Sequence, residues 1–291
     1  MSLFGLNFNK SGKGIEKGET EKNLVFDFFE SFKRNFWNLM KANFCWFVSA
    51  IPVFILLGMF FSMFVYPHLE GVVLELAKNA AVQELDQTIS TYYSQFMILF
   101  VVLVTIVIKS GPASTAFSYL SKCMANEDHV WVFSDFFKQF KENFLKSTIV
   151  LVIDLAAAFV FFNAFVVYLS LYKNTHSVIY FALLALIVIV LIFYIFMHGY
   201  IYQMIATFDN KLGVLYKNAL ILAFAKFPQN FMLIVIPLVI TYFVFTTTAP
   251  ALSAILFVGI WLAAMSYPME FYSARTIRKL TQVSCEDGKD D

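Results

Sequence analysis

The chain has 291 residues, 60% of them apolar and 14% charged, and its mean hydropathy is +0.72. Soluble domains carry about 25% charged residues, so this composition excludes an ordinary soluble protein and indicates one that spans a membrane. The net charge is only +1, and no basic stripe occurs outside the membrane flanks, so nothing indicates a nucleic-acid partner.

Three regions follow one another along the chain. Residues 1–24 are polar and contain four lysines but no apolar core, so they predict a cytoplasmic tail rather than a cleaved signal peptide. Residues 25–280 hold the apolar segments and predict an all-α membrane protein. Residues 281–291 predict an acidic cytoplasmic tail.

Six apolar segments are long enough to cross a bilayer, which takes about 20 helical residues. The second, fifth and sixth are close to the minimum length. We predict transmembrane helices at residues 44–66, 92–108, 147–171, 178–204, 231–247 and 250–267.

The distribution of basic residues gives the orientation. With the amino terminus in the cytoplasm, 19 of the 21 lysines and arginines lie on the cytoplasmic side, and only Lys78 and Lys173 lie outside. We therefore predict a multi-pass protein of the cell membrane with both termini in the cytoplasm. The largest outer loop is acidic, and its pattern over residues 72–85 predicts a short helix outside the bilayer.

A repeated sequence precedes each pair of predicted spans. Its copies are Phe32-Lys33-Arg34-Asn35-Phe36, Phe140-Lys141-Glu142-Asn143-Phe144 and Phe227-Pro228-Gln229-Asn230-Phe231. The first two extend further, since Asp27-Phe28-Phe29 matches Asp135-Phe136-Phe137 in the same register. The repeat predicts three pseudo-repeated hairpins, each preceded by an amphipathic interfacial helix. The third copy is degenerate.

The first two lead-in helices place phenylalanines on one stripe at i, i+3, i+4 and i+7. Such a helix can lie in the membrane interface and bend into the span, with the repeated asparagine bonding to backbone groups freed at the bend. Alternatively, the stripe docks into a groove on a partner protein. The candidate docking residues are Phe28, Phe29, Phe32, Phe136, Phe137 and Phe140.

Three interruptions occur where the even-numbered spans reach the cytoplasm: Ser110-Gly111-Pro112, His198-Gly199-Tyr200 and Ser266-Tyr267-Pro268. Glycine and proline free backbone groups, so each interruption predicts a kink followed by a bent helical continuation. Gly111 and Pro112 are the predicted structural break, and the small residues 113–116 after them allow close helix contact.

No motif for catalysis or cofactor binding is present. The chain lacks a Walker A sequence, a G-x-S-x-G elbow and an H-E-x-x-H pair, and its four histidines are scattered. Its three cysteines form no C-x-x-C pair, which argues against a zinc site or a disulfide. We therefore predict a protein that is not an enzyme and that binds no metal or cofactor.

Asp154 is the single acidic residue within the predicted spans. A carboxylate there costs about 2.5 to 3.5 kcal/mol on insertion scales, so we expect it to face the bundle interior. Its partner would be His198 or a tyrosine of the fourth span, and Asn163 is placed to line the same face. Asp154 either serves as a proton relay or substrate contact, or makes an interhelical hydrogen bond.

Two segments carry a family resemblance. Residues 110–119 contain Gly-Pro-Ala-x-x-Ala, and residues 132–144 contain Asp-Phe-Phe-x-x-Phe-Lys-x-Asn-Phe. They resemble the YesL family of bacterial membrane proteins, which is labelled as a domain of unknown function, and the resemblance extends over about residues 40–180. It implies an integral membrane protein of Gram-positive-type bacteria. YesL genes often neighbour those of sugar-importing ABC transporters, and the family supplies no catalytic residues.

These observations lead to two functional hypotheses. The first is a non-enzymatic accessory or regulatory component associated with carbohydrate ABC-type uptake, with a sugar permease or its ATPase as partner. The second is a stand-alone small-solute transporter that uses Asp154. The lipid bilayer is a partner in both, and a homo-oligomer is compatible with either.

Overall fold

A computed structural model describes residues 24–77, 85–107 and 109–287, and every regular element within these ranges is helical. Most of the predicted amino-terminal tail, part of the predicted outer helix and the end of the acidic tail lie outside them. The elements are α1 (Leu24–Arg34), α2 (Phe36–Phe60), a π-helical segment (Phe61–Val65), α3 (Tyr66–Ala77), α4 (Leu85–Val107), α5 (Pro112–Asn126), α6 (Val132–Glu142), α7 (Phe144–Thr175), α8 (Val178–Ile205), α9 (Leu212–Ala225), α10 (Phe227–Thr247), α11 (Pro250–Leu256), a second π-helical segment (Phe257–Trp261) and α12 (Leu262–Asp287).

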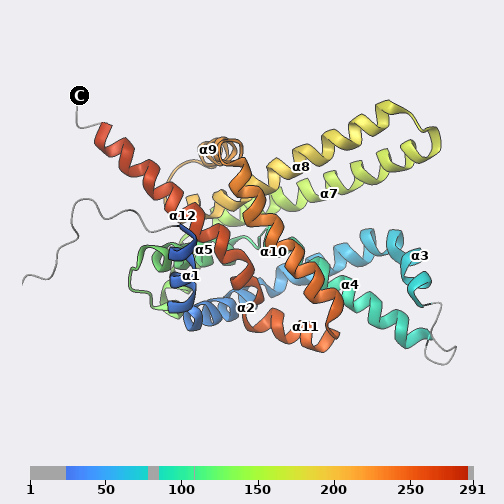
Figure 1. Cartoon of the computed structure of the whole chain (residues 1–291), viewed down its shortest axis with the longest axis horizontal. Coiled ribbons are helices and arrows are strands. Elements are labelled where there is room, and N and C mark those ends of the chain that lie inside the picture. The colour runs from blue at the N-terminus through green and yellow to red at the C-terminus, as the bar shows by residue number, and fades with distance from the viewer. Residues whose placement is uncertain (1–23, 78–84, 108, 288–291) are drawn as a thin grey trace, which may run out of the picture.

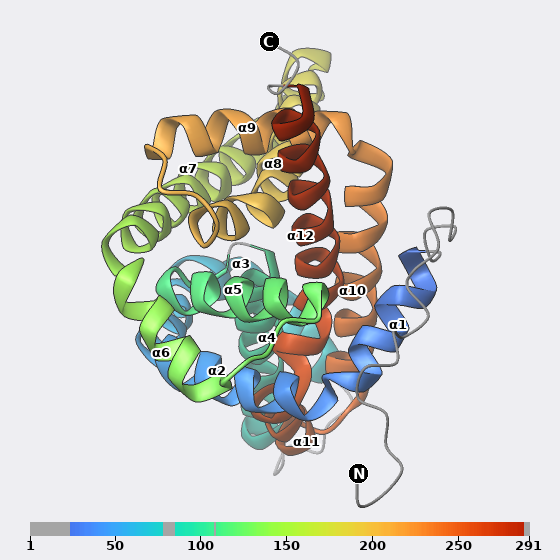
Figure 2. The ribbon, with the colours of Figure 1, turned by 90° about the vertical axis from the view of Figure 1, so that its left-hand side faces the viewer.

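Six helical segments are apolar and long enough to cross a membrane, as the sequence predicts. Figure 1 shows α7 and α8 as a hairpin that diverges from α2 and α4. Figure 2 shows α12 with α10 on one side and α5 and α8 on the other. Several segments are longer than predicted, since the helices continue beyond their most apolar stretch. The six are Phe36–Gly71, Asp86–Ile106, Phe144–Thr175, Val178–Ile205, Phe227–Thr247 and Ala251–Leu280.

The helix predicted outside the bilayer at residues 72–85 is not separate over its described part. The chain stays helical from Phe36 through the first π-helical segment to Ala77, so α3 continues the first span. The next described residue is Leu85, where α4 begins. The apolar pattern that indicated a separate outer helix therefore belongs partly to an extension of α2.

Asparagine side chains occupy the bends between the first two lead-in helices and their spans. Asn35 lies between α1 and α2, and its Nδ2 donates to the carbonyl oxygen of Ser31 at 3.0 Å. Asn143 lies between α6 and α7, and its Nδ2 donates to the carbonyl oxygen of Gln139 at 3.3 Å. At both bends the asparagine side chain thus bonds to the local backbone, but the carbonyl oxygen also accepts from the main-chain N–H of the same asparagine and is not freed by the bend.

The third copy of the repeat bends earlier, at Lys226 between α9 and α10. Pro228 lies in the first turn of α10, where a missing N–H leaves no hydrogen bond unmade and allows the helix to begin sooner. Asn230 consequently lies inside α10, and its Nδ2 donates to the carbonyl oxygens of Leu222 and Ala223, both at 3.3 Å. Asn230 therefore still donates hydrogen bonds to carbonyl groups at the carboxyl end of α9, the third lead-in helix.

Of the three predicted interruptions, one ends a helix. Gly111 lies between α4 and α5 with φ of 65°, a conformation that costs glycine little, and Pro112 begins α5. In contrast, α8 is continuous through Gly199 and α12 is continuous through Pro268. The predicted helical continuation is therefore present at both positions, because packing within a bundle outweighs the modest helix penalty of one glycine and tolerates proline in a spanning helix.

Gly199 instead permits a close approach between α8 and α12. A Cβ atom at this position would lie 2.1 Å from Cε and 2.9 Å from Cγ of Met269. Gly213 in α9 provides a contrast, since nothing lies within 4 Å of a Cβ added there.

We expect Gly199→Ala to lower the free energy of unfolding by about 1 to 3 kcal/mol, because the added methyl overpacks the α8–α12 contact. Gly213→Ala is the matched control and should leave stability unchanged or slightly raised. Thermal unfolding of the purified proteins in detergent measures both. Equal stability of Gly199→Ala and the wild type would contradict the contact.

Candidate functional site

Asp154 lies on the buried face of α7. The buried residues of this helix are Ser147, Val150, Leu151 and Asp154, which is the spacing of a single helical face. Asp154 itself has no exposed surface. The carboxyl group faces the interior, as predicted, so its hydrogen bonds must come from the protein.

Three side chains of α8 surround the Asp154 carboxyl group. Tyr194, His198 and Tyr202 follow at intervals of four residues and share one face of α8. The Tyr194 hydroxyl donates to Oδ1 at 2.8 Å, and Nε2 of His198 lies 2.6 Å from the same oxygen. The Tyr202 hydroxyl donates to Oδ2 at 3.0 Å. The histidine and the tyrosines predicted as alternative partners thus bind Asp154 together.

The contacts of His198 determine how many protons the pair holds. Nδ1 lies 2.8 Å from the carbonyl oxygen of Tyr194, which can only accept, so we assign a proton to Nδ1. The contact between Nε2 and Oδ1 of Asp154 then requires a second proton, carried either by the ring or by the carboxyl group. Both arrangements are neutral overall. Loss of this shared proton would leave a lone pair facing a carboxylate with no water between them.

Tyr216 brings α9 close to the same site. Burial raises the pKa of its phenol, and the charge of Asp154 raises that pKa further. Its hydroxyl oxygen is buried and has no hydrogen-bond partner among the described residues. Tyr216 therefore lies near Asp154 without a hydrogen bond to it, and the bonds to the carboxyl group come from α8 alone among the described residues.

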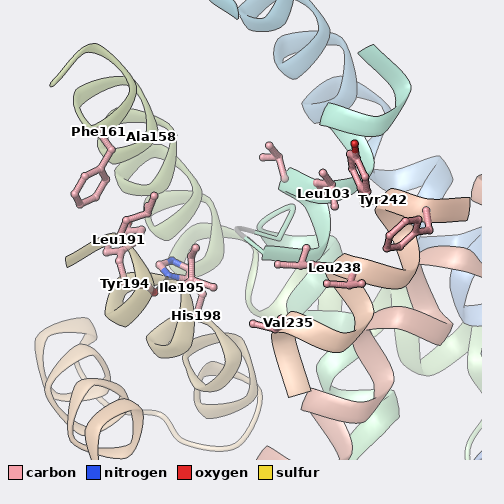
Figure 3. Close-up of a pocket in the computed structure, with 13 residues that line it drawn as sticks. Leu103, Ala158, Phe161, Leu191, Tyr194, Ile195, His198, Val235, Leu238 and Tyr242 are labelled. Atoms are coloured by element: carbon pink, nitrogen blue, oxygen red, sulfur yellow. Dashed lines mark hydrogen bonds between the residues drawn. The ribbon is translucent and has the colours of Figure 1, made fainter. Parts of the chain in front are cut away.

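A cavity of about 660 Å³ separates the α7–α8 hairpin from α4 and α10 (Figure 3). Tyr194 and His198 line it, which connects the cavity to the Asp154 site. Tyr242 is the other polar side chain in its walls. The apolar walls include Leu103, Val104, Ala158, Leu191, Leu238 and Val239.

This cavity is suited neither to remain empty nor to hold water. The recess is open to its surroundings rather than sealed inside the core, so the medium around these helices can fill its volume of about 660 Å³. A buried water needs two to four polar partners, and these walls offer few. The cavity therefore favours an apolar occupant.

Asn163 is not part of this site. It lies nine residues beyond Asp154 on α7, its side chain is half-buried, and its Nδ2 donates to the carbonyl oxygen of Phe159 at 2.8 Å. The amide is satisfied by its own helix, so it supplies no second polar group beside Asp154.

The phenylalanine stripes pack mainly within the chain. Lead-in helix α1 is held on α12 by a hydrogen bond between the hydroxyls of Ser31 and Tyr267 at 2.6 Å. Phe29 and Phe137 are exposed by 62% and 44%, and these two remain accessible to a partner. The other four predicted docking residues are fully buried or pack against the core; they are Phe136, Phe28, Phe32 and Phe140.

A second buried ionic cluster was missed by the sequence reasoning. Nζ of Lys109 lies 2.8 Å from Oε1 of Glu270, and the two side chains are exposed by only 3% and 1%. With its amide nitrogen turned toward acceptors, Gln203 donates to Oε2 of Glu270 at 2.9 Å and to the carbonyl oxygen of Ser118 at 3.0 Å. The cluster joins the end of α4 to α5, α8 and α12.

Lys109 and Glu270 were overlooked for identifiable reasons. Lys109 counts as a flanking cytoplasmic lysine in the sequence, and Glu270 follows Pro268, where the sixth span was expected to have ended. Because α12 continues through Pro268, Glu270 enters the core. Extending the helical pattern past Pro268 would have shown that the acidic residue Glu270 lies between apolar neighbours.

Other reactive groups show no further site. Burial raises the pKa of the Cys123 thiol in α5, which makes it a poor nucleophile. No group of three or more histidine, cysteine, aspartate or glutamate residues suited to a metal ion occurs within the described ranges.

Comparison with known proteins relates part of this region to a family. The family model described as "Protein of unknown function, DUF624" matches residues 91–165, which include the Gly111 break and Asp154. The match contains both segments that carry the YesL resemblance, residues 110–119 and 132–144. No curated protein and no solved structure matches the chain.

We expect Glu270→Gln to lower the free energy of unfolding by about 3 to 5 kcal/mol, because it leaves Lys109 charged and unpaired in the core. The double variant Lys109→Met with Glu270→Leu should recover most of that loss, since it removes both charges together. Chemical unfolding in detergent measures the difference. A double variant less stable than Glu270→Gln would contradict this account.

Proposed function

We propose that this chain is a small-solute transporter of the cell membrane that uses Asp154 and His198 as a proton-binding pair. One observation carries the proposal: Oδ1 of the buried Asp154 lies 2.6 Å from Nε2 of His198, and His198 lines a cavity between apolar helices. Ionisable residues inside a membrane are costly and mark proton or substrate pathways. The carboxyl group and the imidazole can both exchange a proton, and His198 lines the cavity, which supports a functional role for this pair.

We further infer that the chain crosses the membrane six times with both termini in the cytoplasm, and that it is a YesL-type protein built from three hairpin repeats. The even number of apolar helices and the excess of basic residues on one side support the topology. Lys109 is buried in an ion pair, so its charge adds nothing to that argument. The match over residues 91–165 supports the family assignment.

The accessory role in carbohydrate uptake stays a prediction. Phe136 lies in the core and is unavailable to a partner, whereas Phe29 and Phe137 are exposed. Phe28, Phe32 and Phe140 are partly buried. We prefer the transporter hypothesis, because it gives a role to the buried Asp154 and His198 side chains and the accessory hypothesis does not.

Protonation offers a simple cycle for such a transporter. With the shared proton in place, the Asp154–His198 pair is neutral overall, which suits its buried site. When the proton leaves, the net negative charge favours water access or movement of α8 away from α7. The packing of the α7–α8 hairpin against the rest of the helices would then change, and with it the shape of the cavity that His198 lines.

We expect Asp154→Asn to abolish solute accumulation, because asparagine keeps the shape of the side chain but cannot exchange the proton. Vesicles containing the wild type or the variant are loaded with a pH gradient and incubated with a bacterial cell extract. Mass spectrometry then identifies compounds that accumulate only with the wild type, at a level about tenfold or more above the variant.

The matched control is Asn163→Ala, which alters a polar side chain of the same helix outside the site. It should accumulate the same compounds as the wild type. Equal accumulation by Asp154→Asn and the wild type, or no accumulation by either, would overturn the transporter hypothesis.

The protonation of His198 is testable directly. In Asp154→Asn we expect a neutral ring protonated on Nδ1, because the carbonyl oxygen of Tyr194 still accepts from Nδ1 and the asparagine amide can donate to Nε2. Nitrogen-15 NMR of histidine-labelled protein measures this, and His198→Gln identifies the signal. A doubly protonated ring in Asp154→Asn would show that the proton does not depend on the carboxyl group.

A further inference from the structure

The α7–α8 hairpin contacts the rest of the chain mainly at one end. Every residue of α8 from Phe196 to Ile205 is buried, whereas between Val178 and Ile195 burial is confined to Leu184. Figure 1 shows the hairpin diverging from α3 and α4 toward its tip. The cavity lies where this divergence begins, beside His198.

The walls of the cavity belong entirely to helices that are long and apolar enough to cross a membrane. Figure 3 shows Ala158 and Leu191 on the hairpin side and Leu103 and Leu238 opposite. Among the polar groups in the walls, Tyr194 and His198 are already bonded to Asp154. A sugar placed here would leave most of its hydroxyl groups without partners.

We propose that an acyl chain occupies this cavity, entering sideways from the bilayer, and that the transported solute is an amphiphile with such a chain. The statement about the solute rests on the proposed function, whereas binding of the chain does not. Apolar walls accept methylene groups at no polar cost, and bilayer lipids are present at high local concentration.

The volume argues against a helix of a second copy as the occupant. A helix about 10 Å wide fills 660 Å³ over a length of about 8 Å, or one and a half turns. A spanning helix would therefore force the hairpin further from the bundle. A flexible acyl chain follows the existing shape.

The test uses the full chain in vesicles of phosphatidylethanolamine and phosphatidylglycerol that contain a phosphatidylcholine with a diazirine in its acyl chain. Irradiation forms adducts, and mass spectrometry maps them to residues. Leu103 and Val104 are half-buried and line the cavity, so they report on its occupant. Val152 is exposed by 60% on the outer face of α7 and reports on bulk lipid.

Two double variants separate the cavity from the lipid-facing surface. Ala158→Trp with Val239→Trp fills the cavity from both walls and should reduce adducts at Leu103 by about fivefold relative to Val152. Ala156→Trp with Val160→Trp adds the same bulk on the exposed face of α7 and should leave the ratio unchanged. If the first variant does not fold, the single change Ala158→Phe replaces it.

Absence of adducts at Leu103 in the wild type, or an equal ratio in both double variants, would overturn the proposal. In a companion experiment, a diazirine amino acid placed at position 103 reports on a protein neighbour, and cross-links between two copies of the chain from that position would assign the cavity to an oligomer instead. The same labelling in Asp154→Asn separates the two hypotheses. If Asp154→Asn keeps the labelling and still accumulates solute, the transporter hypothesis is contradicted and acyl-chain binding is supported. If accumulation is lost and the cavity is not labelled, acyl-chain binding is contradicted and the transporter hypothesis is supported.

Discussion

A polar group inside a bilayer must find its partners within the protein, and the buried carboxyl group of Asp154 is the strongest case in this chain. Its hydrogen bonds come from Tyr194, His198 and Tyr202 of α8, so the buried face of α7 must meet one particular face of α8. This requirement fixes the register of the hairpin. It also explains why two helices that otherwise face lipid over most of their length are held together at a defined position.

The Lys109–Glu270 pair extends the same constraint to the rest of the bundle. Gln203, one residue after Tyr202 on α8, donates to Glu270 of α12, and Lys109, which pairs with Glu270, follows the end of α4. Polar contacts thus tie α4, α5, α7, α8 and α12 at one level of the molecule. Beyond this level α8 has few buried residues, and the α7–α8 hairpin separates from α4 and α10 around an apolar cavity. The positions of the buried polar residues therefore explain why the α7–α8 hairpin packs closely against the bundle at one end and diverges from it at the other.

Sequence reasoning located the elements better than their ends and junctions. The asparagine of the repeat was correctly expected at the bends of the first two units, because a short polar side chain readily bonds to nearby backbone groups. Pro228 moved the third bend, and this shift was not predicted. The interruptions at Gly199 and Pro268 did not break their helices, since neighbouring helices decide whether a weak helix breaker ends a helix. Phe136 shows the same limit: an amphipathic stripe indicates a buried face but does not say whether lipid, a partner or the chain itself covers it.

Hydropathy and length by themselves determined that this is an all-helical protein with six apolar helices, because a bilayer imposes a minimum run of apolar residues that is visible in the sequence. Composition also singled out Asp154, since one acid among apolar residues is conspicuous. Only the tertiary structure decided that Asp154 meets His198, that Lys109 meets Glu270 across 161 positions, and that a cavity lies beside the first pair. Such contacts depend on how helices distant in sequence rotate and cross, and local periodicity carries no information about that.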